Sequence, residues 1–158
     1  MIAEIKDTNM KIIIRKAKIQ DADSIIGFQQ AMALETESMM LANEVIQAGV
    51  KAVFEDKAKG QYYIAEYEGN VIASLMITFE WSDWRNKQVW WFQSVYVVPE
   101  YRRSGIFRKM YDYIKREALN DKAGGLRLYV EKDNIRAQKT YEAMGMDGDH
   151  YRFYEDMI

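Results

Sequence analysis

The sequence predicts an α/β protein with a central mixed sheet and helices on both faces. Two patterns in different parts of the 158 residues support this class. In the first half, two runs of strand-forming residues flank Glu68-Gly69-Asn70, which is a strong signal for an antiparallel hairpin. In the second half, strand-like and helix-like stretches alternate, which implies parallel pairing. Hydrophobic residues make up 49% of the chain, enough for a proper core.

The first third of the chain is expected to hold one strand and two helices. The Ile-rich residues 10–19 form the strand, and Asp21 or Asp23 can cap the helix that follows. Residues 31–43 are less regular. Helical spacing returns over residues 44–56.

The remaining elements follow in the order strand, strand, strand, helix, strand, helix and strand. They are expected over residues 61–67, 71–79, 88–98, 106–118, 127–131, 134–144 and 150–154. No linker, repeat, low-complexity tract or block of charge divides residues 10–158. We therefore expect one domain there, preceded by a loose leader over residues 1–9.

Composition excludes several classes of protein. The net charge is −2, which disfavours general nucleic-acid binding. The chain has no cysteine, hence no disulfide framework, thiolate zinc site or cysteine nucleophile, and its one histidine, His150, disfavours a histidine-based metal site. We expect no bound metal. No run of 18 apolar residues and no signal-peptide pattern is present, so we expect a cytoplasmic protein that does not bind membranes.

The segment that carries the chemistry is a strand, a turn and a helix over residues 93–115. Pro99 ends the strand, a basic turn with a glycine at Gly105 follows, and helical spacing begins at Ile106. Such a turn can bind pyrophosphate, because the first N–H groups of a helix have no intrahelical partner. The alternative is a solvated basic turn that only caps the helix. The Walker and Rossmann phosphate motifs are both absent.

The run V-x-V-x-P-x-x-R-R-x-G-I resembles the acetyl-CoA-binding motif of the GNAT superfamily of N-acetyltransferases. The family pattern is [QR]-x-x-G-x-[GA]. Arg102 and Gly105 match it, whereas Phe107 stands where the family usually has Gly or Ala. The predicted order of elements is also that of the GNAT acyl-CoA N-acyltransferase fold. The resemblance therefore covers nearly the whole chain.

A second motif lies one strand later. Residues 134–146 resemble the family signature N-x-x-A-x-x-x-Y-x-x-x-G-[FM]. Asn134 suits a helix N-cap, and Ala137 leaves room beside a ligand. Tyr141 lies two helical turns beyond Asn134 on the same face, where its phenol could protonate a departing thiolate. The alternative for Tyr141 is a core aromatic packed on the sheet.

The resemblance implies where acetyl-CoA binds. The pyrophosphate would lie at residues 102–107, the pantetheine arm would pair with the backbone of Val95 and Val97, and the Val97 N–H would polarise the thioester carbonyl. The implied cofactor-binding residues are Val95, Tyr96, Val97, Arg102, Arg103, Ser104, Gly105, Ile106, Phe107, Asn134, Ala137 and Tyr141.

A third stretch, residues 80–86, joins acids, tryptophans and an arginine in one loop. An alkyl ammonium must lose a proton before it attacks, and Glu80 is a candidate base for that step. Asp83 adds acidity, and Trp81 or Trp84 could hold the cation by its ring face. The alternative is an ion-pair network with Arg85 that ties the loop down.

Two earlier acids, Glu35 and Glu37, are rival candidates for the base. In the family, the loop between the first two helices forms one wall of the acceptor site, and both acids lie near that loop.

The predicted function is direct transfer of the acetyl group from acetyl-CoA to a primary amine. Two other classes stay open: an acyl-CoA-binding regulatory or sensor module without turnover, and a module that binds a protein or nucleic acid through residues 102–109. The acceptor cannot be read from the sequence, although the loop at residues 80–86 favours a small cationic amine. A homodimer is compatible with the sequence but is not predicted by it.

Overall fold

A computed structural model describes residues 10–158, so the predicted leader lies outside the described residues. The described chain divides into two compact units, residues 10–127 and 128–158. The first unit contains β1 (Ile13–Lys16), α1 (Ala22–Glu37), α2 (Asn43–Glu55), β2 (Gln61–Tyr67), β3 (Asn70–Ser82), β4 (Lys87–Val97), α3 (Ile106–Asn120) and β5 (Gly125–Arg127), with two short 3-10 turns at Ile19–Asp21 and Pro99–Tyr101. The second unit contains α4 (Ile135–Ala143).

The five strands form one mixed sheet in the order β1-β2-β3-β4-β5. The first four pair antiparallel, and β5 pairs parallel with β4. Glu68 and Gly69 both have positive φ, 49° and 78°, as the two central residues of a type I′ turn require. The predicted hairpin and the predicted mixed sheet are both confirmed.

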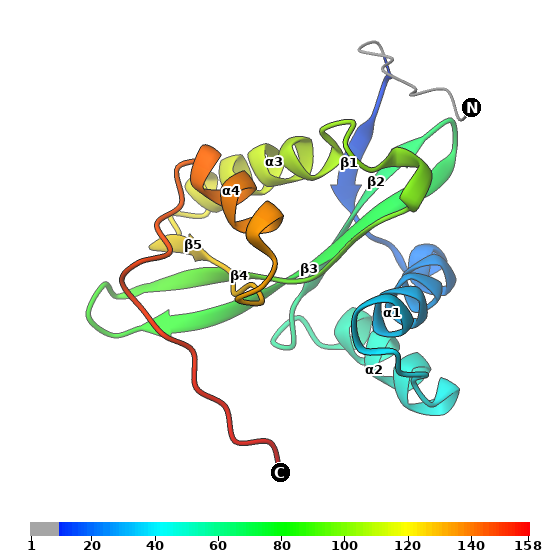
Figure 1. Ribbon diagram of the computed structural model, residues 1–158, viewed down its shortest axis with the longest axis horizontal. Coiled ribbons are helices and arrows are strands. Elements are labelled where there is room, and N and C mark those ends of the chain that lie inside the picture. The colour runs from blue at the N-terminus through cyan, green and yellow to red at the C-terminus, as the bar shows by residue number, and fades with distance from the viewer. Residues whose placement is uncertain (1–9) are drawn as a thin grey trace. The chain divides into compact units, whose positions relative to one another are not determined.

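Helices of the first unit cover both faces of its sheet. The side chains of Tyr62 and Ile64 are buried with residues of α1 and α2. The intervening Tyr63 points to the other face, where its ring meets Tyr113 of α3 edge-on at 6.1 Å. Figure 1 shows the same division, with α3 on one side of the strands and α1 and α2 on the other. The core therefore consists of two layers, one on each side of β2, β3 and β4.

The structure differs from the predicted secondary structure in three places. Residues 31–37 belong to α1, because this Ala-, Met-, Leu- and Glu-rich stretch has high helix propensity and no breaker. The fifth strand ends at Arg127 instead of continuing to residue 131. Residues 150–154 form no strand, although their aromatic pattern suits one. A strand needs a backbone partner, and alternation alone does not supply it.

The second unit, taken by itself, is a short helix with defined ends. The Asn134 side chain accepts a hydrogen bond from the Ala137 N–H at 3.1 Å, which confirms it as the N-cap. At the other end Gly145 has φ 86°, and the N–H groups of Gly145 and Met146 donate to the carbonyls of Glu142 and Tyr141. This is a Schellman motif, so Gly145 ends the helix.

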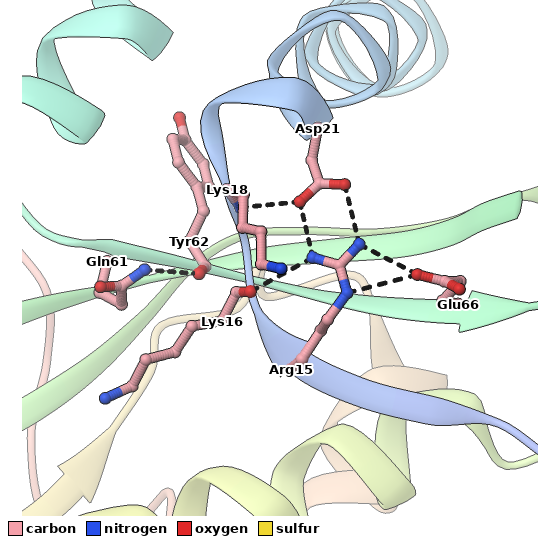
Figure 2. Close-up of polar contacts among 7 residues, drawn as sticks. All are labelled: Arg15, Lys16, Lys18, Asp21, Gln61, Tyr62 and Glu66. Atoms are coloured by element: carbon pink, nitrogen blue, oxygen red, sulfur yellow. Dashed lines mark hydrogen bonds and ion pairs between the residues drawn. The ribbon is translucent and has the colours of Figure 1, made fainter. Parts of the chain in front are cut away.

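An ion-pair network fastens β1 to the start of α1 and to β2 (Figure 2). The Arg15 guanidinium donates two hydrogen bonds to Asp21, at 2.7 and 3.0 Å, and reaches Glu66 of β2 at 3.0 Å. The Lys18 N–H donates to the same Asp21 carboxylate at 2.7 Å. Asp21 is only 7% exposed, and the Arg15 contact is the main reason that its pKa lies below the usual range.

Replacing Asp21 with asparagine is expected to lower the free energy of unfolding by about 2–4 kcal/mol, because Arg15 then keeps only Glu66 as a charged partner. This corresponds to roughly 5–12 °C in the melting temperature. A lowered pKa in the folded chain means that the contribution is present above about pH 4 and is lost as the pH falls through the folded value. The gap between wild type and variant in thermal melts should therefore narrow below about pH 4.

The matched control is Asp56→Asn, which removes the exposed Asp56–Lys59 pair. Exposed pairs add little, so we expect a shift of about a degree or less. Equal shifts for the two variants would contradict the role given to the Arg15–Asp21 pair.

Candidate active site

β4 has a bulge near its end, and beyond its pairing with β5 one of its two edges has no strand beside it. The register with β3 runs from Gln93 opposite Met76 to Tyr96 opposite Ser74, so β4 carries one extra residue there. Ser94, inside the bulge, has φ 50°. Among the described strands, β5 pairs with β4 only at residues 89–91. Residues 93–97 therefore form an open edge of β4 on the side away from β3.

The backbone N–H and the backbone carbonyl of Val97 both face this open edge. The next N–H, that of Val98, donates to the Ile72 carbonyl at 2.9 Å, so alternation along an antiparallel pair directs the N–H and carbonyl of Val97 away from β3. The Val97 carbonyl indeed accepts a hydrogen bond from Arg102 Nε at 2.8 Å. An extended ligand could pair with this edge as a further strand does.

The turn between β4 and α3 is built on left-handed backbone. Arg103 has φ 67° and Gly105 has φ 79°. The first intrahelical bond of α3 runs from Lys109 N–H to the Gly105 carbonyl. The N–H groups of the first helical residues, from Ile106 on, consequently have no intrahelical acceptor, and the positive end of the helix dipole adds to their attraction for an anion.

The structure explains how Phe107 fits a position where the family has Gly or Ala. Its ring lies 6.2 Å from that of Phe92 and 6.5 Å from that of Tyr111, so it belongs to the layer between α3 and the sheet. Ile106 beside it is 2% exposed. Both side chains are thus used for packing, and the backbone of the turn is what remains for a ligand.

An acid of α1 reaches the open edge. Glu35 accepts a hydrogen bond from the Arg102 guanidinium at 2.9 Å. The same guanidinium lies over the ring of Tyr96, 5.3 Å from its centre, and that ring stacks on Phe28 of α1 at 5.1 Å. The predicted acceptor-site acid Glu35 and the predicted cofactor residues Tyr96, Val97 and Arg102 therefore lie together. Glu35 also raises the pKa of Arg102.

Glu80 lies elsewhere on the sheet. Its carboxylate accepts hydrogen bonds from Arg127 of β5 at 2.6 Å and from the Trp91 indole at 2.8 Å. It stands opposite Val89, eight residues from Val97, or about 26 Å along the strand. Both of its oxygens thus help to hold β3, β4 and β5 together. Sequence reasoning missed the partners Trp91 and Arg127, because no local pattern signals them.

The other predicted acceptor residues are exposed. Asp83 and Trp84 belong to the turn that joins β3 to β4, where the Asp83 carboxylate accepts from the Trp84 N–H at 2.9 Å. Trp81 and Trp84 are 57% and 92% exposed. Glu37 is exposed at the end of α1. The loop at residues 80–86 and the turn at residues 102–107 lie at opposite ends of β4, so they do not form one cluster.

In the second unit, the motif residues lie on α4. Ala137 and Tyr141 are half-buried, four residues apart on one face of the helix. Burial raises the pKa of the Tyr141 phenol. The group is therefore protonated at neutral pH, as a proton donor must be.

Neither a membrane-spanning helix nor a cluster of metal-ligating side chains occurs within residues 10–158. No helix in this range is long and apolar enough to cross a membrane. Nor do three or more His, Cys, Asp or Glu side chains gather there as a possible metal site.

Comparison with known proteins decides the family. The sequence model of the acetyltransferase (GNAT) family matches residues 28–146, which is most of the chain. The chain belongs to the GNAT acetyltransferase family. A crystal structure of a possible acetyltransferase from Clostridium difficile 630 is 45% identical, with a TM-score of 0.86 over 93% of this chain and 97% of that one. The GNAT fold expected from the sequence is therefore confirmed.

Two curated acetyltransferases match part of the chain. A thialysine N-epsilon-acetyltransferase from Bos taurus is 36% identical over 67 residues, which are 42% of this chain. An S-alkylcysteine N-acetyltransferase from Bacillus subtilis (strain 168) is 25% identical over 113 residues, or 69% of this chain. The matches span 39% and 62% of the lengths of these relatives.

Proposed function

We propose that this GNAT protein moves the acetyl group of acetyl-CoA to a primary amine by direct attack in a ternary complex. The observation that carries the proposal is the open edge of β4 leading into the turn at the start of α3. One end of this segment suits an extended arm with amide groups, and the other suits a pyrophosphate.

The cofactor would use backbone groups for most of its contacts. In this proposal the pantetheine arm pairs with Val95 and Val97, and the pyrophosphate meets the N–H groups of residues 105–107 together with Arg102 and Arg103. The Val97 N–H, which points away from β3, donates to the thioester oxygen and stabilises the charge that develops there. Asn134 and Ala137 would flank the arm.

On the acceptor side we assign the base to Glu35. Of the three acids predicted for this role, it is the one that bonds a residue of the cofactor turn. Both oxygens of Glu80 are already engaged, and Glu80 lies far along the strand from Val97. The two curated relatives are named for small amine acceptors, thialysine and S-alkylcysteine, which supports a small amine here as well.

The reaction then has three linked steps. A carboxylate takes a proton from the acceptor ammonium, directly or through water. The free amine attacks the thioester carbon, the carbon–sulfur bond breaks, and the nitrogen gives its extra proton to solvent as the amide forms. The Tyr141 phenol gives its proton to the departing thiolate. Holding both reactants side by side supplies much of the rate, and no covalent enzyme intermediate is needed.

The experiment is an assay of thiol release from acetyl-CoA with single amines: thialysine, S-methylcysteine, a polyamine, an aminoglycoside and a lysine peptide. The expected result is amine-dependent release of CoA with a matching acetylated amine by mass spectrometry. Tight binding of acetyl-CoA without turnover on any amine would instead support an acyl-CoA-binding regulatory or sensor module.

Replacing Glu35 with glutamine is expected to lower kcat/KM for the best amine by roughly 10²-fold, since a general base contributes 10²–10⁴. The same change at Glu80 should lower kcat/KM less than about threefold and act mainly on stability, because Glu80 is part of a half-buried ion pair with Arg127. Thermal melts beside the kinetics separate the two effects. A larger kinetic loss in Glu80→Gln than in Glu35→Gln would return the base role to Glu80.

A further inference from the structure

We propose that Glu35 and the pyrophosphate of CoA compete for Arg102, so that CoA binding releases the Glu35 carboxylate for the acceptor ammonium. This inference rests on the proposed function. In this proposal the Arg102–Glu35 ion pair couples CoA binding at the turn to the availability of Glu35 for the acceptor amine.

Arg102 has three partners within the protein. Its Nε donates to the Val97 carbonyl at 2.8 Å, a terminal nitrogen donates to Glu35 at 2.9 Å, and its planar group lies over Tyr96. Glu35 comes from α1, whereas Arg102 follows β4, 67 residues later. The contact therefore joins α1 to the segment that follows β4.

Two of these partners, the Val97 carbonyl and the Glu35 carboxylate, would compete with a bound cofactor. The Val97 carbonyl lies on the open edge, where the amide groups of the arm would seek an acceptor. The guanidinium is the type of group that binds phosphate oxygens through paired hydrogen bonds. When the cofactor enters, the arm competes for Val97 and the pyrophosphate competes for the guanidinium, so both bonds of Arg102 exchange together.

The pair is suited to exchange because it is exposed. The side chains of Arg102 and Glu35 are 39% and 43% exposed, so water screens their attraction and the contact is weak. A pyrophosphate at the helix start offers more charge than one carboxylate, and the N–H groups of the turn assist it. Glu35 then loses its cation, and the ammonium of the acceptor can take its place.

The test is calorimetric titration of the full chain with CoA. Four variants are compared with wild type: Glu35→Gln, Glu37→Gln, Arg102→Ala and the double variant Glu35→Gln/Arg102→Ala. Glu37→Gln is the matched control. Glu37 lies two residues after Glu35 and is also exposed, so the variant removes the same charge from a neighbouring side chain. Any gain in CoA affinity that comes only from a less negative surface appears in both Glu35→Gln and Glu37→Gln.

We expect Glu35→Gln to bind CoA about two- to fivefold more tightly than wild type, the range of an exposed ion pair. Glu37→Gln should stay within about 1.5-fold, and Glu35→Gln should give no gain in the Arg102→Ala background, since its partner is then absent. An equal gain in Glu37→Gln, or a gain that persists without Arg102, would overturn the exchange. Failure of wild type to bind CoA would overturn the proposed function instead.

Discussion

Replacing Tyr141 with phenylalanine is expected to lower kcat by about 10²–10³-fold while changing the affinity for CoA less than threefold. The reason is that a general acid contributes about 10²–10⁴ to the rate, and the variant removes only the proton donor. The pKa of the Tyr141 phenol is raised by burial, so the group carries its proton across the neutral range. Rates with saturating amine and calorimetry with CoA measure the two quantities.

A matched control is Tyr62→Phe. Tyr62 is a buried tyrosine whose pKa is likewise raised by burial, but it belongs to the core under α1 and α2. Its loss should alter stability and leave kcat within about twofold. If Tyr141→Phe retained most of the wild-type kcat, Tyr141 would be a packing residue and another group would protonate the sulfur.

Gly105→Trp is expected to weaken CoA binding by at least about 100-fold. Gly105 has φ 79°, a conformation that costs other residues about 1–2 kcal/mol. A Cβ placed there meets no atom within 4 Å, so the indole projects from the turn instead of clashing inside it. In the proposed CoA complex, the pyrophosphate occupies the open space beside Gly105.

Gly69→Trp separates strain from the loss of a site. Gly69 has nearly the same φ, 78°, and equally open surroundings, but it lies in the turn between β2 and β3. Both variants should lose similar stability, and only Gly105→Trp should lose CoA. Equal CoA affinities for Gly105→Trp and wild type would show that the turn does not hold the cofactor.

Sequence reasoning succeeded where the determinants are local. The hairpin at Gly69, the turn at Gly105 and the cap at Asn134 each follow from one or two residues whose backbone or side chain has few alternatives. The family motifs consist largely of such positions. That is why the fold and the family could be predicted before any contact was known.

Contacts between distant residues could not be predicted in the same way. The Arg102–Glu35 pair joins residues 67 apart, and the Arg127–Glu80 pair joins residues 47 apart. Whether an acid is available to a ligand depends on such partners, which one sequence does not reveal. The strand expected at residues 150–154 failed for a related reason, since a strand exists only where another backbone is present to pair with it.

The bulge at Ser94 had no sequence signal at all. Serine in a run of strand-forming residues looks ordinary, yet its φ of 50° interrupts the register of β4. Glycine would have signalled a left-handed residue at this position.

The central claim is that residues 93–107 bind the arm and the pyrophosphate of CoA as one unit. The most direct measurement is calorimetric titration of the wild-type chain with acetyl-CoA, CoA and ATP. We expect micromolar binding of both CoA compounds and at least tenfold weaker binding of ATP, which has phosphates but no arm for the open edge. No binding of either CoA compound, or ATP binding as tight as that of CoA, would contradict it.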